Sequence, residues 1–130
     1  MQRTGVLLLL IAGLMLTAVG CGNDLVPVTG TITINGQPTG NLQVDFEPKD
    51  PSKGTTGTGY TKPDGTYELH YPGYKVGAPA GEYIVKITAA ETNDPETQVP
   101  PIPAKYNTNS ELEATVASGA SEFDFQLTVP

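Results

Sequence analysis

The sequence predicts an all-β protein, a single antiparallel β-sandwich of seven strands that follows an N-terminal helical signal segment. Apolar and polar residues alternate in seven segments after residue 25, as expected for strands with one buried face. Turn-forming Asn, Gly and Pro residues stand between these segments. After residue 20, no run of ten or more residues has the apolar spacing of a helix.

The first element is the signal segment. Arg3 makes the start of the chain positive, and residues 6–19 form an uncharged, mostly apolar run. A helix of that length spans about 21 Å, which is less than the ~30 Å hydrocarbon core of a bilayer. We therefore expect residues 1–20 to be a cleaved signal peptide and not a permanent membrane span.

The only cysteine of the chain, Cys21, stands directly after this segment. Residues 18–21, Ala-Val-Gly-Cys, resemble the lipobox of bacterial lipoproteins. The resemblance implies cleavage between Gly20 and Cys21, attachment of acyl chains such as palmitate to Cys21, and a lipidated tether over residues 21–25. Two or three acyl chains hold a protein firmly in a membrane, either the outer membrane or the periplasmic face of the inner membrane. The alternative is a buried free cysteine after an ordinary signal peptide.

Seven predicted strands fill the rest of the chain, residues 26–130, which is long enough for one domain and not for two. Each has one apolar and one polar face, and in chain order they are residues 28–34, 42–47, 55–61, 66–71, 83–89, 111–116 and 123–129. Asn35 and Gly36 predict a tight turn, because both residues tolerate a positive φ angle. Pro63, Asp64 and Gly65 predict another.

Two segments interrupt the alternation, residues 48–54 and residues 93–109. The longer segment contains four prolines, which cannot donate the hydrogen bonds of a sheet. A long loop of this kind is often functional. We favour the other interpretation, in which Val99, Ile102 and Tyr106 hold the loop against a sheet edge or an end of the sandwich.

Several of these residues resemble those of carboxypeptidase-regulatory-like domains. The resemblance lies in residues 28–48, the turn at residues 61–67 and residues 79–85. Residues 102–106 and 123–125 resemble the end of short bacterial lipoproteins with such a domain. The resemblance implies a transthyretin-like, Ig-like sandwich over nearly all of residues 26–129. It implies no peptidase activity in this chain.

The charge balance excludes one class of partner. Without residues 1–20 the chain keeps six lysines and no arginine against 14 acidic residues. A nucleic-acid partner is excluded, because few cations remain to neutralise phosphates. Anionic lipid headgroups would also repel the acidic domain, so we expect its body to stand off the membrane.

Little in the sequence points to catalysis. The one histidine, His70, falls on the polar face of its strand, and the one cysteine is assigned to lipid. A nucleophilic triad needs a base beside a serine or cysteine, and a metal site needs several ligands. We therefore predict no enzyme, no cofactor and no metal. The expected role is an interaction with another envelope protein, or a structural one.

The alternative is a carbohydrate-binding module for cell-wall or external polysaccharide. Such modules stack exposed aromatic rings on sugars, and the candidate rings here are those of Tyr60, Tyr71, Tyr74 and Tyr106. Tyr74 follows Pro72 and Gly73, so it is the ring that we most expect on an exposed loop. Against this alternative, the chain has no tryptophan, and the tyrosines could simply cap the core.

Overall fold

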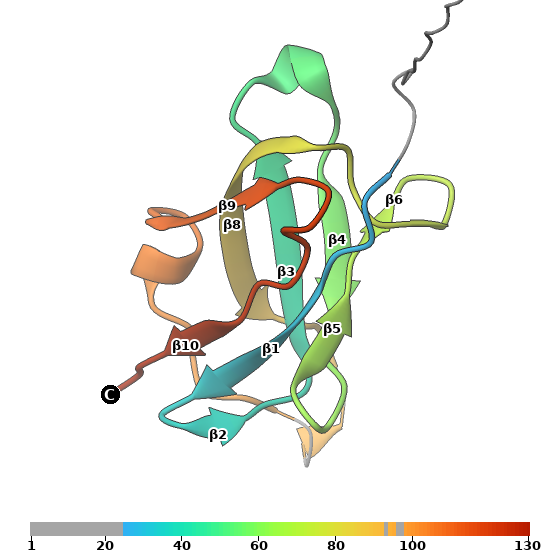
Figure 1. Ribbon diagram of the computed structural model, residues 1–130. Helices are drawn as coiled ribbons and strands as arrows, with labels where there is room; N and C mark the ends of the chain where they lie inside the picture. Colours follow the sequence, from blue (N-terminus) through green and yellow to red (C-terminus); the bar gives the residue numbers. More distant parts are fainter. Residues whose placement is uncertain (1–24, 93, 96–97) are drawn as a thin grey trace, which may run out of the picture.

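A computed structural model describes residues 25–92, 94–95 and 98–130 (Figure 1). The predicted signal segment, the cleavage site at Gly20 and the lipid attachment site at Cys21 lie outside the described residues. In the part that is described, no helix is both long and apolar enough to cross a membrane.

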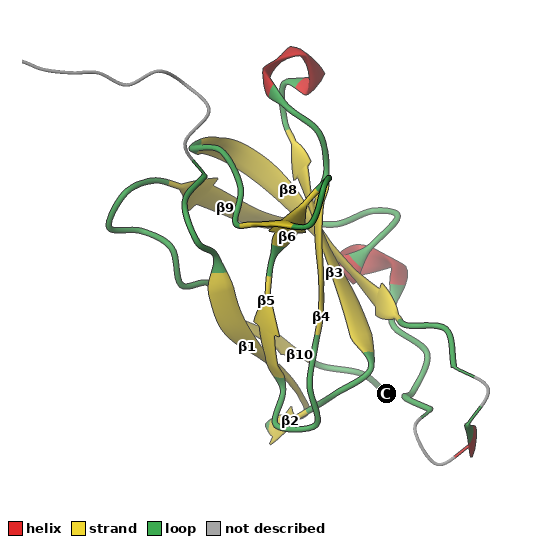
Figure 2. Cartoon of the chain, turned by 90° about the vertical axis from the view of Figure 1, so that its right-hand side faces the viewer, coloured by secondary structure: helices red, strands yellow, loops and turns green. Residues whose placement is uncertain are grey.

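The described residues of the domain contain ten short strands and two 3-10 turns. In chain order they are β1 (Thr29–Ile34), β2 (Gln37–Pro38), β3 (Leu42–Pro48), η2 (Pro51–Lys53), β4 (Gly57–Tyr60), β5 (Thr66–Glu68), β6 (His70–Tyr71), β7 (Lys75–Val76), β8 (Gly81–Ala89), η4 (Ala104–Tyr106), β9 (Leu112–Val116) and β10 (Phe125–Leu127). The larger sheet has the order β7-β6-β4-β3-β8-β9. In the smaller sheet, β10, β2 and β5 all pair with β1 (Figures 1 and 2). The predicted all-β sandwich is confirmed.

The central pair of the larger sheet shows why alternation predicts this fold. Strands β3 and β8 pair in register, with Val44 opposite Ile87 and Phe46 opposite Val85. All four of these side chains are fully buried between the sheets. Because successive side chains point to opposite faces, the residues between them, such as Asp45, lie on the outer face.

The segment 66–71 differs from the single strand that the sequence predicts. It forms two strands that belong to different sheets, because β5 pairs with β1 while β6 pairs with β4. Leu69 lies between them, fully buried, and its N–H donates to the Val28 carbonyl at 2.9 Å. The chain therefore crosses from one sheet to the other at Leu69. The structure also contains two strands that the sequence does not predict, the two-residue strands β2 and β7, so it has more than the predicted seven strands.

The antiparallel prediction is wrong for one strand pair. Strands β1 and β10 are parallel, with Ile32 beside Phe125 and Ile34 beside Leu127. The other paired strands are antiparallel. No tight turn joins β1 to β10, since they come from opposite ends of the domain, so hairpin geometry does not fix their direction.

The core continues beneath the long proline-containing segment. Phe46 is at the centre of the core. The centroid of its ring lies 5.8 Å from that of Tyr83, 5.9 Å from that of Phe123 and 6.5 Å from that of Phe125. Val99 and Ile102 pack against this core, and Tyr106 is part of it. These three side chains therefore hold the described part of the segment against the core, as the favoured interpretation predicts for them.

Candidate binding groove

An open groove of about 610 Å³ lies on the outer side of the larger sheet, toward its β7 edge. Residues from β3, β4, β6, the segment just before β4 and the turn after β6 line it: Gln43, Thr56, Thr58, Tyr60, His70, Tyr71, Pro72, Gly73 and Tyr74. The groove combines three aromatic rings with amide, hydroxyl and imidazole groups.

The turn between β6 and β7 forms one rim of the groove. Tyr71 pairs with Lys75, so residues 72–74 form the loop of a short hairpin. Gly73 and Tyr74 both have a positive φ angle, 88° and 63°. That conformation is normal for glycine and unusual for a bulky side chain. It leaves Tyr74 almost entirely in solvent, 95% exposed.

The other two tyrosines of the groove are held differently. Tyr60, at the end of β4, is 58% exposed. Tyr71 is half-buried, and its hydroxyl oxygen accepts hydrogen bonds from the Thr55 N–H at 2.8 Å and the Thr55 hydroxyl at 3.0 Å. The structure thus brings Tyr60, Tyr71 and Tyr74 together, with one ring fixed and two exposed.

Tyr106 does not belong to this group. It is only 8% exposed, and its hydroxyl accepts a hydrogen bond from the Thr128 N–H at 2.9 Å. The expectation that Tyr106 could face a ligand is therefore corrected. Its ring fills the core under the long loop.

Polar groups line the groove beside the rings. Thr58 donates its hydroxyl hydrogen to Asp45 at 2.9 Å, and the Gln43 amide donates to both oxygens of the same carboxylate at 3.2 Å. His70 lies opposite Thr58 on the next strand, with its Nε2 atom 3.5 Å from the Glu68 carboxylate. These groups can exchange hydrogen bonds with a neutral polar ligand, while the rings offer it apolar faces.

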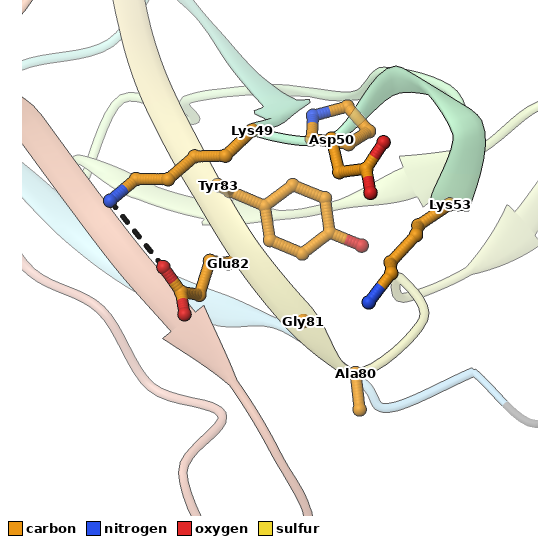
Figure 3. A pocket seen from close by; sticks show the side chains of 8 residues that line it. Lys49, Asp50, Lys53, Ala80, Gly81, Glu82 and Tyr83 are labelled. Carbon is orange, nitrogen blue, oxygen red and sulfur yellow. Dashed lines mark ion pairs between the residues drawn. The ribbon is translucent and has the colours of Figure 1, made fainter.

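A second pocket, of about 350 Å³, lies near η2 and the start of β8 (Figure 3). Lys49 is 2.9 Å from the Glu113 carboxylate and 3.6 Å from that of Glu82. Its hydrogen bond with Glu113 is the main reason that the pKa of Lys49 is raised. Asp50 accepts hydrogen bonds from the side chain and the N–H of Ser52, which lower the pKa of Asp50. The groove is the stronger binding candidate, because it is larger and gathers three tyrosine rings, whereas this pocket has one.

Metal-ligating residues do not gather anywhere in the described part of the chain: no group of three or more His, Cys, Asp or Glu side chains there could hold an ion. The groove itself contributes one such residue, His70, to its lining.

Comparison with known proteins found no matching family model, no matching curated protein and no matching solved structure. The function must therefore be argued from the groove and the sequence. Sequence reasoning singled out its tyrosines but missed Gln43 and Thr58. Their signal is the pairing register, which places Gln43 opposite Tyr60 and Thr58 opposite His70.

Proposed function

We propose that the protein is a non-catalytic lipoprotein of a bacterial cell envelope, anchored by acyl chains on Cys21, whose sandwich presents the groove to an envelope protein. The observation that carries the proposal is the position of the chain's only cysteine, directly after an apolar signal-like run. The tyrosine groove supports the binding role, because exposed aromatic groups in one concavity are typical of recognition surfaces.

The contacts of His70 support the non-catalytic part of the proposal. An activated nucleophile needs a base within hydrogen-bond reach of a hydroxyl or thiol. The Nε2 atom of this single histidine lies instead 3.5 Å from the Glu68 carboxylate, and both side chains are about half exposed. The relation to carboxypeptidase-regulatory-like domains is part of the same proposal, and it would add no peptidase chemistry.

Substitution of the anchor residue tests the proposal. In Cys21→Ala, we expect incorporation of a labelled palmitate analogue to be lost, together with recovery of the protein in the membrane fraction. The matched control is Lys62→Gln, a surface change in the β4–β5 turn that should keep both label and membrane association. A Cys21→Ala protein that still carries the label would refute anchoring at this residue.

The second candidate function is carbohydrate binding, favoured by one observation: Tyr60 and Tyr74 are exposed beside the polar groups of the groove. Titration with soluble cell-wall glycan fragments tests it. If the rings stack on sugars, Tyr60→Ala should weaken binding at least about tenfold, or ~1.4 kcal/mol. Equal binding by Tyr60→Ala and Lys62→Gln would exclude stacking on Tyr60.

A further inference from the structure

The exposed large apolar side chains are gathered in one place. In the described ranges they are Tyr60, Tyr74 and Val76, which are 58%, 95% and 43% exposed. Two of the three belong to the β6–β7 hairpin, and Tyr60 lines the groove beside it. Apolar groups that gather on an otherwise polar surface indicate a contact surface.

The chain enters the domain beside this hairpin. The Val26 N–H donates to the Ala78 carbonyl at 2.8 Å, and the Ala78 N–H donates back to Val26 at 3.0 Å. A Cβ atom at Gly77 would collide with the Val26 carbonyl, so the two backbones are in close contact. Figure 1 shows the entering segment, in blue, passing next to β6. An anchor on the chain just before Val26 would therefore also keep the β6–β7 hairpin close to that anchor.

The length of chain between the anchor and the domain limits how far the domain can withdraw. Cys21 stands five residues before Val26. Five residues span at most ~18 Å when fully extended. A domain of roughly 100 residues has a radius of gyration of about 13 Å. An acylated Cys21 would thus keep the surface around Val26, including the hairpin, close to the lipid headgroups.

The chemistry of the hairpin suits that location. Residues 69–81 contain Lys75 and no acidic residue, in a domain that is otherwise strongly acidic. Tyrosine is favoured at the boundary between headgroups and water, and a lysine side chain can reach anionic headgroups. The repulsion expected from the overall charge is therefore weakest at the hairpin.

The backbone of Tyr74 gives a second, independent argument. Its φ angle of 63° would suit glycine or asparagine better than an aromatic residue. The ring gains almost no burial in return, because it is 95% exposed. Since packing within the domain does not explain the ring, a contact outside the domain is the better explanation.

We propose that the β6–β7 hairpin is a second membrane contact, with Tyr74 and Val76 in the headgroup region and Lys75 beside anionic headgroups. The inference rests on the proposed anchoring at Cys21. A weak contact is sufficient, because the anchor makes hairpin binding intramolecular and raises its effective concentration to the millimolar range. The hairpin would then fix the orientation of the domain and leave the Tyr60 end of the groove open to a partner.

A tryptophan probe tests this contact, because the chain has no tryptophan of its own. Full-length Tyr74→Trp protein is purified from membranes and reconstituted into vesicles of phosphatidylethanolamine and phosphatidylglycerol that contain a lipid spin-labelled near its headgroup. We expect a blue-shifted emission and at least about twofold quenching by the labelled lipid. The control is Gln37→Trp in β2, an exposed site at the end of the domain opposite the entering chain (Figures 1 and 2), where little quenching is expected.

Vesicle flotation separates the two ways in which the test can fail. Protein that floats with the vesicles but shows equal quenching in both variants overturns the hairpin contact and leaves the anchoring intact. Protein that does not float refutes the anchoring, and the hairpin contact with it. Emission from Tyr74→Trp that responds to glycan fragments and not to labelled lipid overturns the membrane contact and supports carbohydrate binding.

Discussion

The six tyrosines of this protein occupy two regions with opposite properties. Three are buried, and each donates its hydroxyl hydrogen to a backbone carbonyl: Tyr67 to Phe123 at 2.6 Å, Tyr83 to Pro79 at 2.6 Å and Tyr106 to Thr128 at 3.4 Å. The other three, Tyr60, Tyr71 and Tyr74, line one open groove.

The difference lies in what surrounds each ring. A buried tyrosine contributes apolar area to the core, and its hydroxyl must find a partner because an unpaired polar group is costly there. The two exposed rings, Tyr60 and Tyr74, have neither role in the folded domain, whereas the half-buried Tyr71 is held by hydrogen bonds from Thr55. The buried set should therefore determine stability and the exposed set should determine binding, and the substitutions below test that division.

The largest expected effect is that of Tyr67→Ala. Tyr67 is 2% exposed and packs against Gly30 and Phe123 between the sheets. Removing a buried aromatic ring of this size costs about 3–5 kcal/mol of the free energy of unfolding. Tyr60→Ala, at an exposed ring, should cost no more than about 0.5 kcal/mol. Urea denaturation of both variants measures the contrast, and similar costs would contradict the division.

The buried set should also make stability depend on alkaline pH. Burial raises the pKa of Tyr83 to about 12, from 10.0. An acid whose pKa is higher in the folded state stabilises the fold fully below pH 10 and loses this contribution as the pH rises toward 12. Burial also raises the pKa of Tyr67, so Tyr67 contributes to the same loss.

Denaturation midpoints measured from pH 9 to pH 12 test this expectation. In Tyr83→Phe, the titrating hydroxyl is gone, so the decline in the free energy of unfolding between about pH 10 and 12 should become shallower. If Tyr83→Phe and the unchanged protein decline in parallel, then the Tyr83 phenol ionises in the folded protein as it does in the unfolded chain.

The sequence predicts some features of this fold and not others, because only some of them depend on the local pattern of apolar and polar residues. Alternation determines which side chains of a strand face the core, so it correctly places Val44, Phe46, Tyr67 and Val85 inside. It does not determine which strands become neighbours. The crossing at Leu69 and the parallel pair β1–β10 depend on contacts between distant segments, and these have no local signal.

The candidate site shows the same limit. Pro72 and Gly73 predict that the Tyr74 that follows them lies on an exposed loop, and that prediction is confirmed. Of the two roles that the sequence allows for Tyr106, the role in holding the loop is confirmed and the ligand-facing role is wrong, because a proline-rich loop can still place one ring in the core. Gln43 and Thr58 could not be joined to Tyr60 and His70 without the register of β3, β4 and β6, which local sequence does not fix.

One substitution in the exposed set should change stability with the opposite sign. Asparagine tolerates a positive φ angle better than an aromatic residue does, so Tyr74→Asn should stabilise the domain by up to about 1 kcal/mol. The same change removes the ring that we assign to the membrane, so it should reduce protection of the hairpin amides from hydrogen exchange when the protein is on vesicles. Lys62→Gln is the matched control and should change neither quantity.

A Tyr74→Asn protein that is clearly less stable would mean that the ring packs on the domain, and the exposed set would then lose its most exposed member. Greater stability together with weaker hairpin protection would show that the domain keeps an unfavourable residue there for a contact outside itself.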